Sequence, residues 1–507
     1  MLLGGRTAIA VSLTEETTRA VVSRMAALSA VADLFEVRAD FVHDLDLPAL
    51  MDARTKPILF TCRPESEGGR WPDADPTGRR ALLRRAVDLG FDLVDVEARA
   101  GFDDVVAAKA GRGLVLSWHD FEGTPRDLDG VHERMATHSP DVVKIAVTAR
   151  SVADLGRLLA FASRRGGAPG PRLVALAMGP LGVASRILGG RYGAPFTFAS
   201  PENGREAAPG QLPAAELADV YRVRSIGAAT RVYGLLGSDV LRSLSPAIQN
   251  RAFAATGTDA VYVPLQAESM SAFVTALPAL GLSGFSVTRP YKSEILPHLD
   301  AVTSHALEAG SVNTVVAQPG RLVGLSTDGD GVLVPLRRWV DPAGCAVVIL
   351  GAGGAARAAA FALVREGARV TVLSRRPAQA AEVASATGCA SAGLESLPGL
   401  AWDVLVNATP LGSGAFPGQS PVSSGVLRRG AVVFDMVYEP RETPLLAAAK
   451  TGGCATIDGL EMLVAQAVGQ FEAWTGVAAP VEEMTGAALA AMAETRASAT
   501  LARHEEA

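Results

Sequence analysis

The chain has 507 residues, enough for two or three domains, and 49% hydrophobic with 20% charged residues is a globular composition. A formal net charge of −6 argues against a basic surface for nucleic acid or for an anionic membrane. The four cysteines are scattered without a Cys-x-x-Cys pair, which excludes the usual zinc and disulfide patterns and favours a reducing cytoplasm.

The start of the chain lacks the apolar core and cleavage site of a signal peptide, and no apolar run approaches 18 residues. We therefore expect no targeting segment and no membrane span. The next feature is a series of eight short apolar segments that alternate with amphipathic stretches. They lie at 7–13, 34–38, 57–62, 93–97, 114–117, 142–147, 173–178 and 196–199. This alternation predicts a (β/α)8 barrel over residues 1–225, with its active site at the carboxyl ends of the strands.

Chemically useful side chains occur where these strands end. Lys144 lies inside an apolar run, where an ammonium must pair, reach water or lose its charge. With a lowered pKa it could form a Schiff base with a carbonyl substrate, although a lysine that reaches water from the strand end is the alternative. The other candidates are Glu36, Arg38, Arg63, Glu97 and His119. Each alone could be structural, but the set predicts an active site.

Seven segments in this part of the chain carry a specific resemblance: FEVRAD, TCRPESEGG, VDVEA, SWHDFEGTP, VVKIAV, MGPLGVASRILG and APGQ. In this order they resemble the type I 3-dehydroquinate dehydratase family over about residues 5–220. The resemblance implies a Schiff base on Lys144, an acid/base at His119 oriented by Glu97, and no metal. It also implies that the remaining substrate groups are bound by Glu36, Arg38, Arg63, Arg186 and Gln211. Ala207 stands where the family often has serine.

A predicted linker at 222–230 precedes a second unit, whose clearest feature is a glycine turn. The apolar strand 346–350 leads into Gly351, Gly353 and Gly354, followed by an alanine-rich helix and a strand at 369–373. Backbone amides at such a helix start can hold a pyrophosphate, although a tight turn without a ligand is the alternative.

The strand after this turn ends in Ser374, Arg375 and Arg376, where an NAD site would usually have an acidic residue. Two guanidinium groups suit the 2′-phosphate of NADP(H). The alternative is a solvated, arginine-rich helix start.

Four further motifs lie upstream, at 243–246, 285–292, 312–314 and 327–331. The last could suggest a calcium loop, but Trp339 stands where the bidentate glutamate would be required. Together with 407–412, 435–438 and 459–466, these motifs resemble shikimate dehydrogenase over about 231–477. The resemblance implies that Lys292 and Asp328 handle the proton. It implies that substrate is bound by Ser243, Ser245, Thr288, Asn313 and Gln466, and that the cofactor also contacts Ala355, Asn407 and Thr409. Ser286, Ser326 and Gln249 depart from the usual pattern.

We therefore predict a bifunctional enzyme that dehydrates 3-dehydroquinate to 3-dehydroshikimate and reduces this ketone to shikimate with NADPH. The second unit should be a two-lobed α/β dehydrogenase with a substrate lobe at 231–330 and a Rossmann lobe at 331–460. Residues 461–507 should form helices that return to the substrate lobe, followed by a tail. Two alternatives remain, a quinate dehydrogenase in the second unit and a metabolite-sensing protein without turnover. The oligomeric state stays open.

Overall fold

The computed structural model describes residues 5–111 and 113–505, so the outermost residues of the predicted ranges 1–225 and 461–507 lie outside the described residues. The chain divides into two compact units. The first contains 5–246, 257–283 and the end of the chain from 500, and the second contains 247–256 and 284–499. The units thus divide the chain within the predicted substrate lobe.

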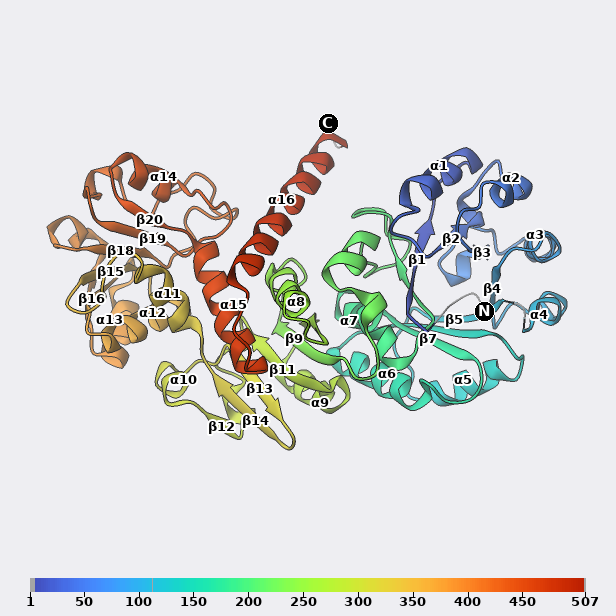
Figure 1. The fold of residues 1–507 in the computed structure, drawn as a ribbon, viewed down its shortest axis with the longest axis horizontal. Helices are drawn as coiled ribbons and strands as arrows, with labels where there is room; N and C mark the ends of the chain where they lie inside the picture. Colours follow the sequence, from blue (N-terminus) through green and yellow to red (C-terminus); the bar gives the residue numbers. More distant parts are fainter. Residues whose placement is uncertain (1–4, 112, 506–507) are drawn as a thin grey trace. The chain divides into compact units, whose positions relative to one another are not determined.

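The first unit is built on eight parallel strands in the order β7-β6-β5-β4-β3-β2-β1-β8. The strands are β1 (Ala8–Leu13), β2 (Leu34–Arg38), β3 (Ile58–Thr61), β4 (Leu93–Glu97), β5 (Leu114–Asp120), β6 (Val142–Thr148), β7 (Arg172–Met178) and β8 (Phe196–Ala199). Helices lie outside them (Figure 1). These are α1 (Thr18–Leu28), α2 (Leu47–Asp52), α3 (Pro76–Asp88), α4 (Asp103–Lys109), α5 (Leu128–Ala136), α6 (Val152–Arg165) and α7 (Val183–Leu188). The predicted (β/α)8 barrel is confirmed, with β7 and β8 as its end strands.

The barrel interior is layered because side chains alternate between the two faces of each strand. One layer is apolar and is formed by residues such as Leu34, Leu59, Leu93, Val115 and Val142. Two residues further along each of these strands, the same inward face carries polar side chains: Glu36, Thr61, Asp95, Ser117 and Lys144. The packed core thus supports a polar layer directly beneath the carboxyl ends of the strands.

The first unit also contains the parallel pair β9 (Arg231–Gly237) and β10 (Ala260–Gln266), and helix α9 (Met270–Leu280). Helix α9 packs closely on α6, since a Cβ added at Gly156 would lie 3.0 Å from Ala276. This packing joins residues of the predicted substrate lobe to the barrel unit.

The second unit holds most of α8 (Ser245–Ala255) and a small sheet in which β11 (Leu282–Val287) and β14 (Arg321–Leu325) both run antiparallel to β13 (Thr314–Gln318). The short β12 (Ala301–Val302) pairs in parallel with β14. The associated helices are α10 (Ser304–Ala309), α11 (Asp328–Leu336), α15 (Gly459–Thr475) and α16 (Val481–Glu505).

The second unit also contains a six-stranded parallel sheet in the order β17-β16-β15-β18-β19-β20. Its strands are β15 (Ala346–Leu350), β16 (Arg369–Ser374), β17 (Ala390–Gly393), β18 (Val404–Asn407), β19 (Val432–Asp435) and β20 (Ala455–Ile457). Val347 and Ile349 face a core shared with α12 (Gly354–Arg365) and α13 (Pro377–Thr387). Val348 and Leu350 face a core with α14 (Pro444–Thr451). Helices therefore cover both faces, which confirms the predicted Rossmann-type lobe.

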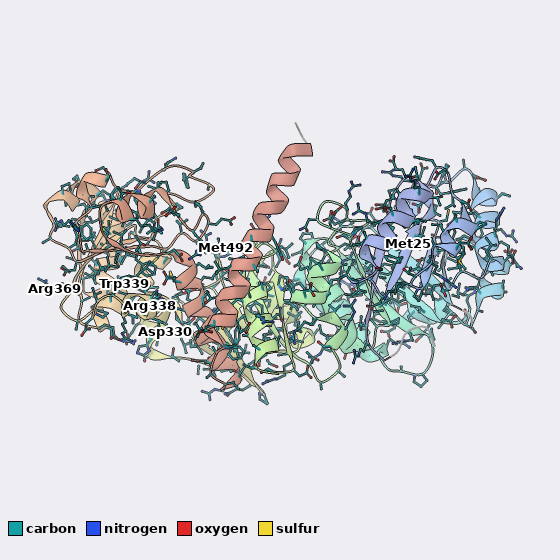
Figure 2. All side chains as sticks on the ribbon, turned by 45° about the horizontal axis from the view of Figure 1, so that its top comes forward. Met25, Asp330, Arg338, Trp339, Arg369 and Met492 are labelled. Atoms are coloured by element: carbon teal, nitrogen blue, oxygen red, sulfur yellow. The ribbon has the colours of Figure 1, made fainter. Side chains whose placement is uncertain are left out.

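Trp339, the residue that argued against a calcium loop, follows α11 and is 53% exposed (Figure 2). Within the described residues, none of the helices is both long enough and apolar enough to span a bilayer. The same part of the chain brings together no group of three or more His, Cys, Asp or Glu side chains suited to a metal ion.

Candidate active sites

Lys144 points into the polar layer of the barrel and is 6% exposed. Its Nζ lies 3.3 Å from Asp95 Oδ2, 4.0 Å from Glu36 Oε1 and 4.3 Å from the ring centre of Phe198. Burial lowers the pKa of Lys144, and the nearby Asp95 carboxylate offsets only part of this effect. A larger fraction of the side chain is therefore the neutral amine, the form that attacks a carbonyl.

Arg63 is held rigidly beside this amine. Its guanidinium donates to Asp95 at 2.9 Å, to Glu97 at 2.9 Å and to Ser117 at 2.8 Å. Burial acts to raise the pKa of Asp95, but the charges of Arg63 and Lys144 outweigh it and hold the pKa below its usual value. Asp95 was not among the residues selected from the sequence, although its place two residues before Glu97 puts both on the inward face of β4.

His119 is the second side chain of the barrel that can take part in the reaction. Its Nδ1 lies 2.9 Å from Glu67 Oε2, and its ring stacks on Phe121 with centroids 6.0 Å apart. Burial lowers the pKa of His119 well below its usual value, with further lowering by Arg63 and Lys144. If Nδ1 carries the proton that Glu67 accepts, Nε2 is free to act as a base.

The expected partner of His119 differs in the structure. The resemblance implied Glu97, but the Glu97 carboxylate bonds Arg63 and, from α3, Arg79. Glu67 takes the place beside the imidazole because it lies in the loop after β3, which folds over the strand ends. Burial raises the pKa of Glu67 to about 7. The signal in the sequence was the segment TCRPESEGG, which contains Glu67.

These groups share one cavity of about 610 Å³. Its lining includes Glu36, Arg38, Arg63, Glu67, His119, Phe121, Lys144, Met178, Arg186, Ala207 and Gln211. All predicted barrel residues except Glu97 therefore line it directly. Ala207 offers no hydroxyl to this lining.

Arg186 suits an anionic substrate group. It is 2% exposed, its Nη2 donates to the Pro209 carbonyl at 3.1 Å, and its buried Nε lacks a hydrogen-bond partner among the described residues. Burial lowers the pKa of Arg186 to about 10. Gln211 reaches the cavity from the same loop, donating to Ser12 at 3.2 Å and accepting from the Ala207 amide at 2.8 Å. Arg38 also lines the cavity and donates to both oxygens of Asp40, at 2.9 and 2.7 Å.

In the second unit, Lys292 and Asp328 form the expected pair. Lys292 Nζ lies 2.9 and 2.8 Å from the two Asp328 oxygens, and Asn313 Nδ2 donates to Asp328 at 2.8 Å. Thr327 fixes Asn313 by donating its amide to Asn313 Oδ1 at 2.9 Å. The Asp328 side chain is 6% exposed and that of Lys292 is 31% exposed. The Lys292 ammonium is partly exposed and is paired with the buried Asp328 carboxylate, so it can give a proton to a bound ligand.

Gln466 and Thr288 lie on elements around this pair. The Gln466 carbonyl accepts from Thr327 at 3.1 Å, and its side chain packs against Gly331, where a Cβ would lie 2.6 Å from it. Thr288 follows β11, and its carbonyl accepts from the Tyr291 amide at 3.0 Å. Ser243 and Ser245 belong to the first unit, where the hydroxyls bond each other at 3.1 Å.

Two of the departures from the family pattern meet through one side chain. Ser286 donates to Gln470 Oε1 at 2.9 Å, and Gln249 reaches the same atom at 3.4 Å. Gln470 is buried and was not selected from the sequence. Ser286 thus bonds within the protein on a strand that borders the Lys292 region.

The glycine turn has the shape that a dinucleotide requires. Gly351 has φ +106°, and a Cβ there would lie 3.0 Å from the Ala408 carbonyl. The space above Gly353 and Gly354 is open, and α12 begins at Gly354 with Ala355 in its first turn. The turn after β18 lies alongside, where Thr409 donates to Asn407 at 2.7 Å and Asn407 donates to Asp435 at 2.9 Å.

At the end of β16, Ser374 Oγ accepts from the Arg376 amide at 3.2 Å. Arg375 and Arg376 are exposed beside it. The open helix start and the two guanidiniums fit the pyrophosphate and the 2′-phosphate of NADP(H).

Comparison with known proteins gives matches in both halves of the chain. The family of type I 3-dehydroquinase matches residues 9–228, the shikimate dehydrogenase substrate binding domain matches 235–315, and the shikimate 5'-dehydrogenase C-terminal domain matches 459–489. The bifunctional 3-dehydroquinate dehydratase/shikimate dehydrogenase of Arabidopsis thaliana is 36% identical, over 89% of this chain and 79% of its own length. A shikimate dehydrogenase (NADP(+)) of Pyrococcus abyssi is 42% identical over 50% of this chain and 96% of its own. The solved dehydroquinate dehydratase and shikimate dehydrogenase from S. pombe AroM is 25% identical, covers 96% of this chain and 98% of its own, and has a TM-score of 0.46.

Proposed function

The chain belongs to the bifunctional 3-dehydroquinate dehydratase/shikimate dehydrogenase family, and from this premise we propose how its residues divide the two reactions. Residues 1–225 dehydrate 3-dehydroquinate to 3-dehydroshikimate, and the lobes at 231–330 and 331–460, with 461–507, reduce it to shikimate. The observation that carries the proposal is the buried Lys144 amine in one cavity with His119.

The dehydratase works through Lys144 as a nucleophile. Its amine attacks the substrate ketone and water leaves, which forms an iminium and makes the neighbouring C–H acidic. His119 Nε2 takes that proton while Glu67 holds Nδ1. The imidazolium then protonates the departing hydroxyl, so a second water forms together with the ring double bond. Addition of water to the product iminium restores the ketone and the amine.

The substrate is oriented by the charged side chains of the same cavity. Arg186 binds the substrate carboxylate through the donors that its buried guanidinium leaves available. Glu36, Arg38, Arg63 and Gln211 take the hydroxyl groups, and Glu97 acts by holding Arg63 in place.

The dehydrogenase uses NADP(H), whose nicotinamide supplies the hydride for the ketone when it is bound. Gly351, Gly353, Gly354 and Ala355 hold the pyrophosphate at the α12 start, and Asn407 with Thr409 lines the adjacent turn. Arg375 and Arg376, with Ser374, hold the 2′-phosphate. Lys292 gives the proton that the new hydroxyl needs, and Asp328 and Asn313 position it. The substrate is bound by Thr288, Asn313 and Gln466, and the resemblance gives Ser243 and Ser245 as the groups for its carboxylate.

Two further parts of the proposal concern partners and place. The partners are the small molecules 3-dehydroquinate, 3-dehydroshikimate and shikimate, without nucleic acid or membrane. The four cysteines are free thiols, which suits the reducing cytoplasm. The name of the Arabidopsis relative places that protein in chloroplasts, so cell fractionation is the test for this one.

One assay tests the whole proposal. The purified protein is given 3-dehydroquinate and NADPH, and nicotinamide absorbance is followed. A steady fall requires both reactions, whereas a metabolite-sensing protein would give none. The quinate dehydrogenase alternative is tested by comparing kcat/KM for shikimate and quinate with NADP(+). We expect shikimate to be preferred, because quinate carries an extra hydroxyl that the pocket would have to accommodate.

A further inference from the structure

A second polar cavity adjoins the barrel site. It spans about 500 Å³, opens to solvent, and lies between the loop after β3 and the loop after β4. A water molecule occupies about 30 Å³ in the liquid, so this space holds several. Of the described residues, Glu67 alone lines both cavities. Glu67 therefore lies between the reaction site and the second cavity.

The lining of the second cavity suits water better than any single ion. Arg79 and Arg99 contribute positive charge, while Asp73, Glu67 and Glu97 contribute negative charge. Arg79 is committed to Glu97, which in turn holds Arg63 of the reaction site. The charges are thus mixed and partly paired, and their polar atoms can hydrogen-bond water molecules.

The proposed Schiff-base chemistry, on which this inference rests, needs water while the product occupies the cavity that holds Lys144 and His119. Iminium formation and elimination each release one water, and hydrolysis of the product iminium consumes one. During hydrolysis the product ring is still attached to Lys144 within that cavity. Lys144 and His119 are each less than a tenth exposed, and the second cavity offers the last water a route that the attached ring does not occupy.

We propose that the second cavity is the water and proton port of the dehydratase, with Glu67 as the gate residue. Water from this cavity reaches His119, whose Nε2 takes a proton while the oxygen adds to the iminium carbon. The new hydroxyl then passes its proton to nitrogen as the C–N bond breaks, which releases the ketone and neutral Lys144. The proton left on His119 leaves through Glu67 into the second cavity.

The electrostatics of Glu67 agree with this role. Its carboxylate accepts from His119 at 2.9 Å, and burial raises its pKa to about 7. A group with such a pKa takes up and releases a proton readily near neutral pH. Iminium formation consumes one proton and hydrolysis returns it, so each turnover needs proton exchange in both directions.

The experiment fills the second cavity without touching the first. Ala100 lines the second cavity, and Ala98 is an exposed alanine two residues earlier that lines neither. We compare Ala100→Leu and Ala100→Trp with the control Ala98→Leu. Dehydratase kcat and KM are measured, and borohydride trapping with mass spectrometry gives the fraction of enzyme present as the Lys144 adduct at steady state.

Filling the port should slow hydrolysis alone. We expect kcat to fall severalfold in Ala100→Leu and tenfold or more in Ala100→Trp, with KM falling in proportion. kcat/KM, which follows capture and elimination, should stay within about twofold of the parent, and the trapped fraction should rise. Ala98→Leu should match the parent.

An unchanged kcat and trapped fraction in either folded Ala100 variant would overturn the port, as would a fall in kcat/KM without adduct accumulation. If Ala100→Trp loses its circular dichroism spectrum, Ala100→Leu decides alone. Absence of any adduct in the parent would instead contradict the Schiff base, which keeps the two proposals separable.

Discussion

Glu67 and His119 form a buried hydrogen bond of 2.9 Å between Oε2 and Nδ1, which joins a loop after β3 to the end of β5. This bond sets the tautomer of the imidazole. It also separates two carboxylates that look alike in the sequence, because Glu67 faces the histidine and Glu97 faces Arg63 and Arg79.

Replacing Glu67 and replacing Glu97 should therefore have different effects on the dehydratase. Above pH 7 Glu67 is ionised and holds Nε2 as the base, so dehydratase activity should rise with pH through about 7. Glu67→Gln should remove this rise and lower kcat about 10- to 100-fold. Glu97→Gln should raise KM and lower the melting temperature, because it leaves a buried arginine partly unpaired. pH profiles of both variants check this, and the reverse pattern would return the orienting role to Glu97.

Lys144→Ala should abolish dehydration and leave reduction of added 3-dehydroshikimate near the parental rate, because the amine is needed only in the barrel. Borohydride should trap substrate on Lys144 in the parent. The control Lys56→Ala, which removes another lysine of the barrel unit, should match the parent in both activities and in trapping. An adduct on a different lysine, or dehydration by Lys144→Ala, contradicts the assignment.

Lys292→Ala should lower dehydrogenase turnover by about two orders of magnitude or more, because the proton donor to the new hydroxyl is lost. Cofactor affinity should change less, and the dehydratase not at all. Lys450→Ala removes an exposed lysine paired with Glu442 and serves as the control. Steady-state kinetics for both reactions decide, and near-parental turnover would leave Lys292 with a binding role only.

Changing Arg375 and Arg376 together to alanine should remove the preference for NADPH over NADH, because the 2′-phosphate loses both charges. NADH activity should change little. A matched control changes the exposed Arg365 and Arg369, of which Arg369 starts β16 at the strand's opposite end (Figure 2). The ratio of kcat/KM for the two cofactors is measured. An equal ratio in parent and double variant would place cofactor selection elsewhere.

His132 should make the protein sensitive to acid. The side chain is 7% exposed on α5, and its two ring nitrogens have no hydrogen-bond partner among the described residues. Burial, then the charge of Arg165, lowers its pKa, while Asp129 and Glu133 act in the opposite direction. The unfolded chain therefore takes up a proton first as pH falls below about 6.5, and folded-state stability is lost in that range.

The test of this acid sensitivity is His132→Leu, with the exposed His138→Leu as its control. Between pH 7.5 and 5.5 the melting temperature of His132→Leu should fall less than that of the parent, by an amount corresponding to about 1 kcal/mol at most. His119 contributes equally to the pH dependence of the melting temperature in the parent and in both variants. Parallel melting curves for parent and His132→Leu would show that His132 is not the responsible group.

The sequence predicted most of the barrel because strand parity is a local property. The segment expected at 93–97 is found as Leu93–Glu97, and the one expected at 114–117 extends to Asp120. Asp95 was not predicted as a site residue, because it lies inside an apolar run. The alternation of side chains along the strand that places Lys144 on the inward face nevertheless places Asp95 there too.

Other features depended on contacts that no local pattern contains. Glu67 lies in a loop, whose path over the strand ends is set by tertiary packing. The boundary between compact units depends on the approach of Gly156 to Ala276, which are far apart in the chain. Small residues permit such a close approach, but their presence in the sequence does not predict which segments will pack together.

The layered interior of the barrel has a consequence for how this domain can change over time. Since Lys144 stands two positions beyond Val142 on the same face, inserting or deleting one residue in β6 would exchange core and site together, and both would fail. A point substitution in the polar layer alters the chemistry while the apolar layer beneath stays packed. The domain thus does not tolerate single-residue insertions or deletions in its strands, but substitutions in the polar layer can change its chemistry.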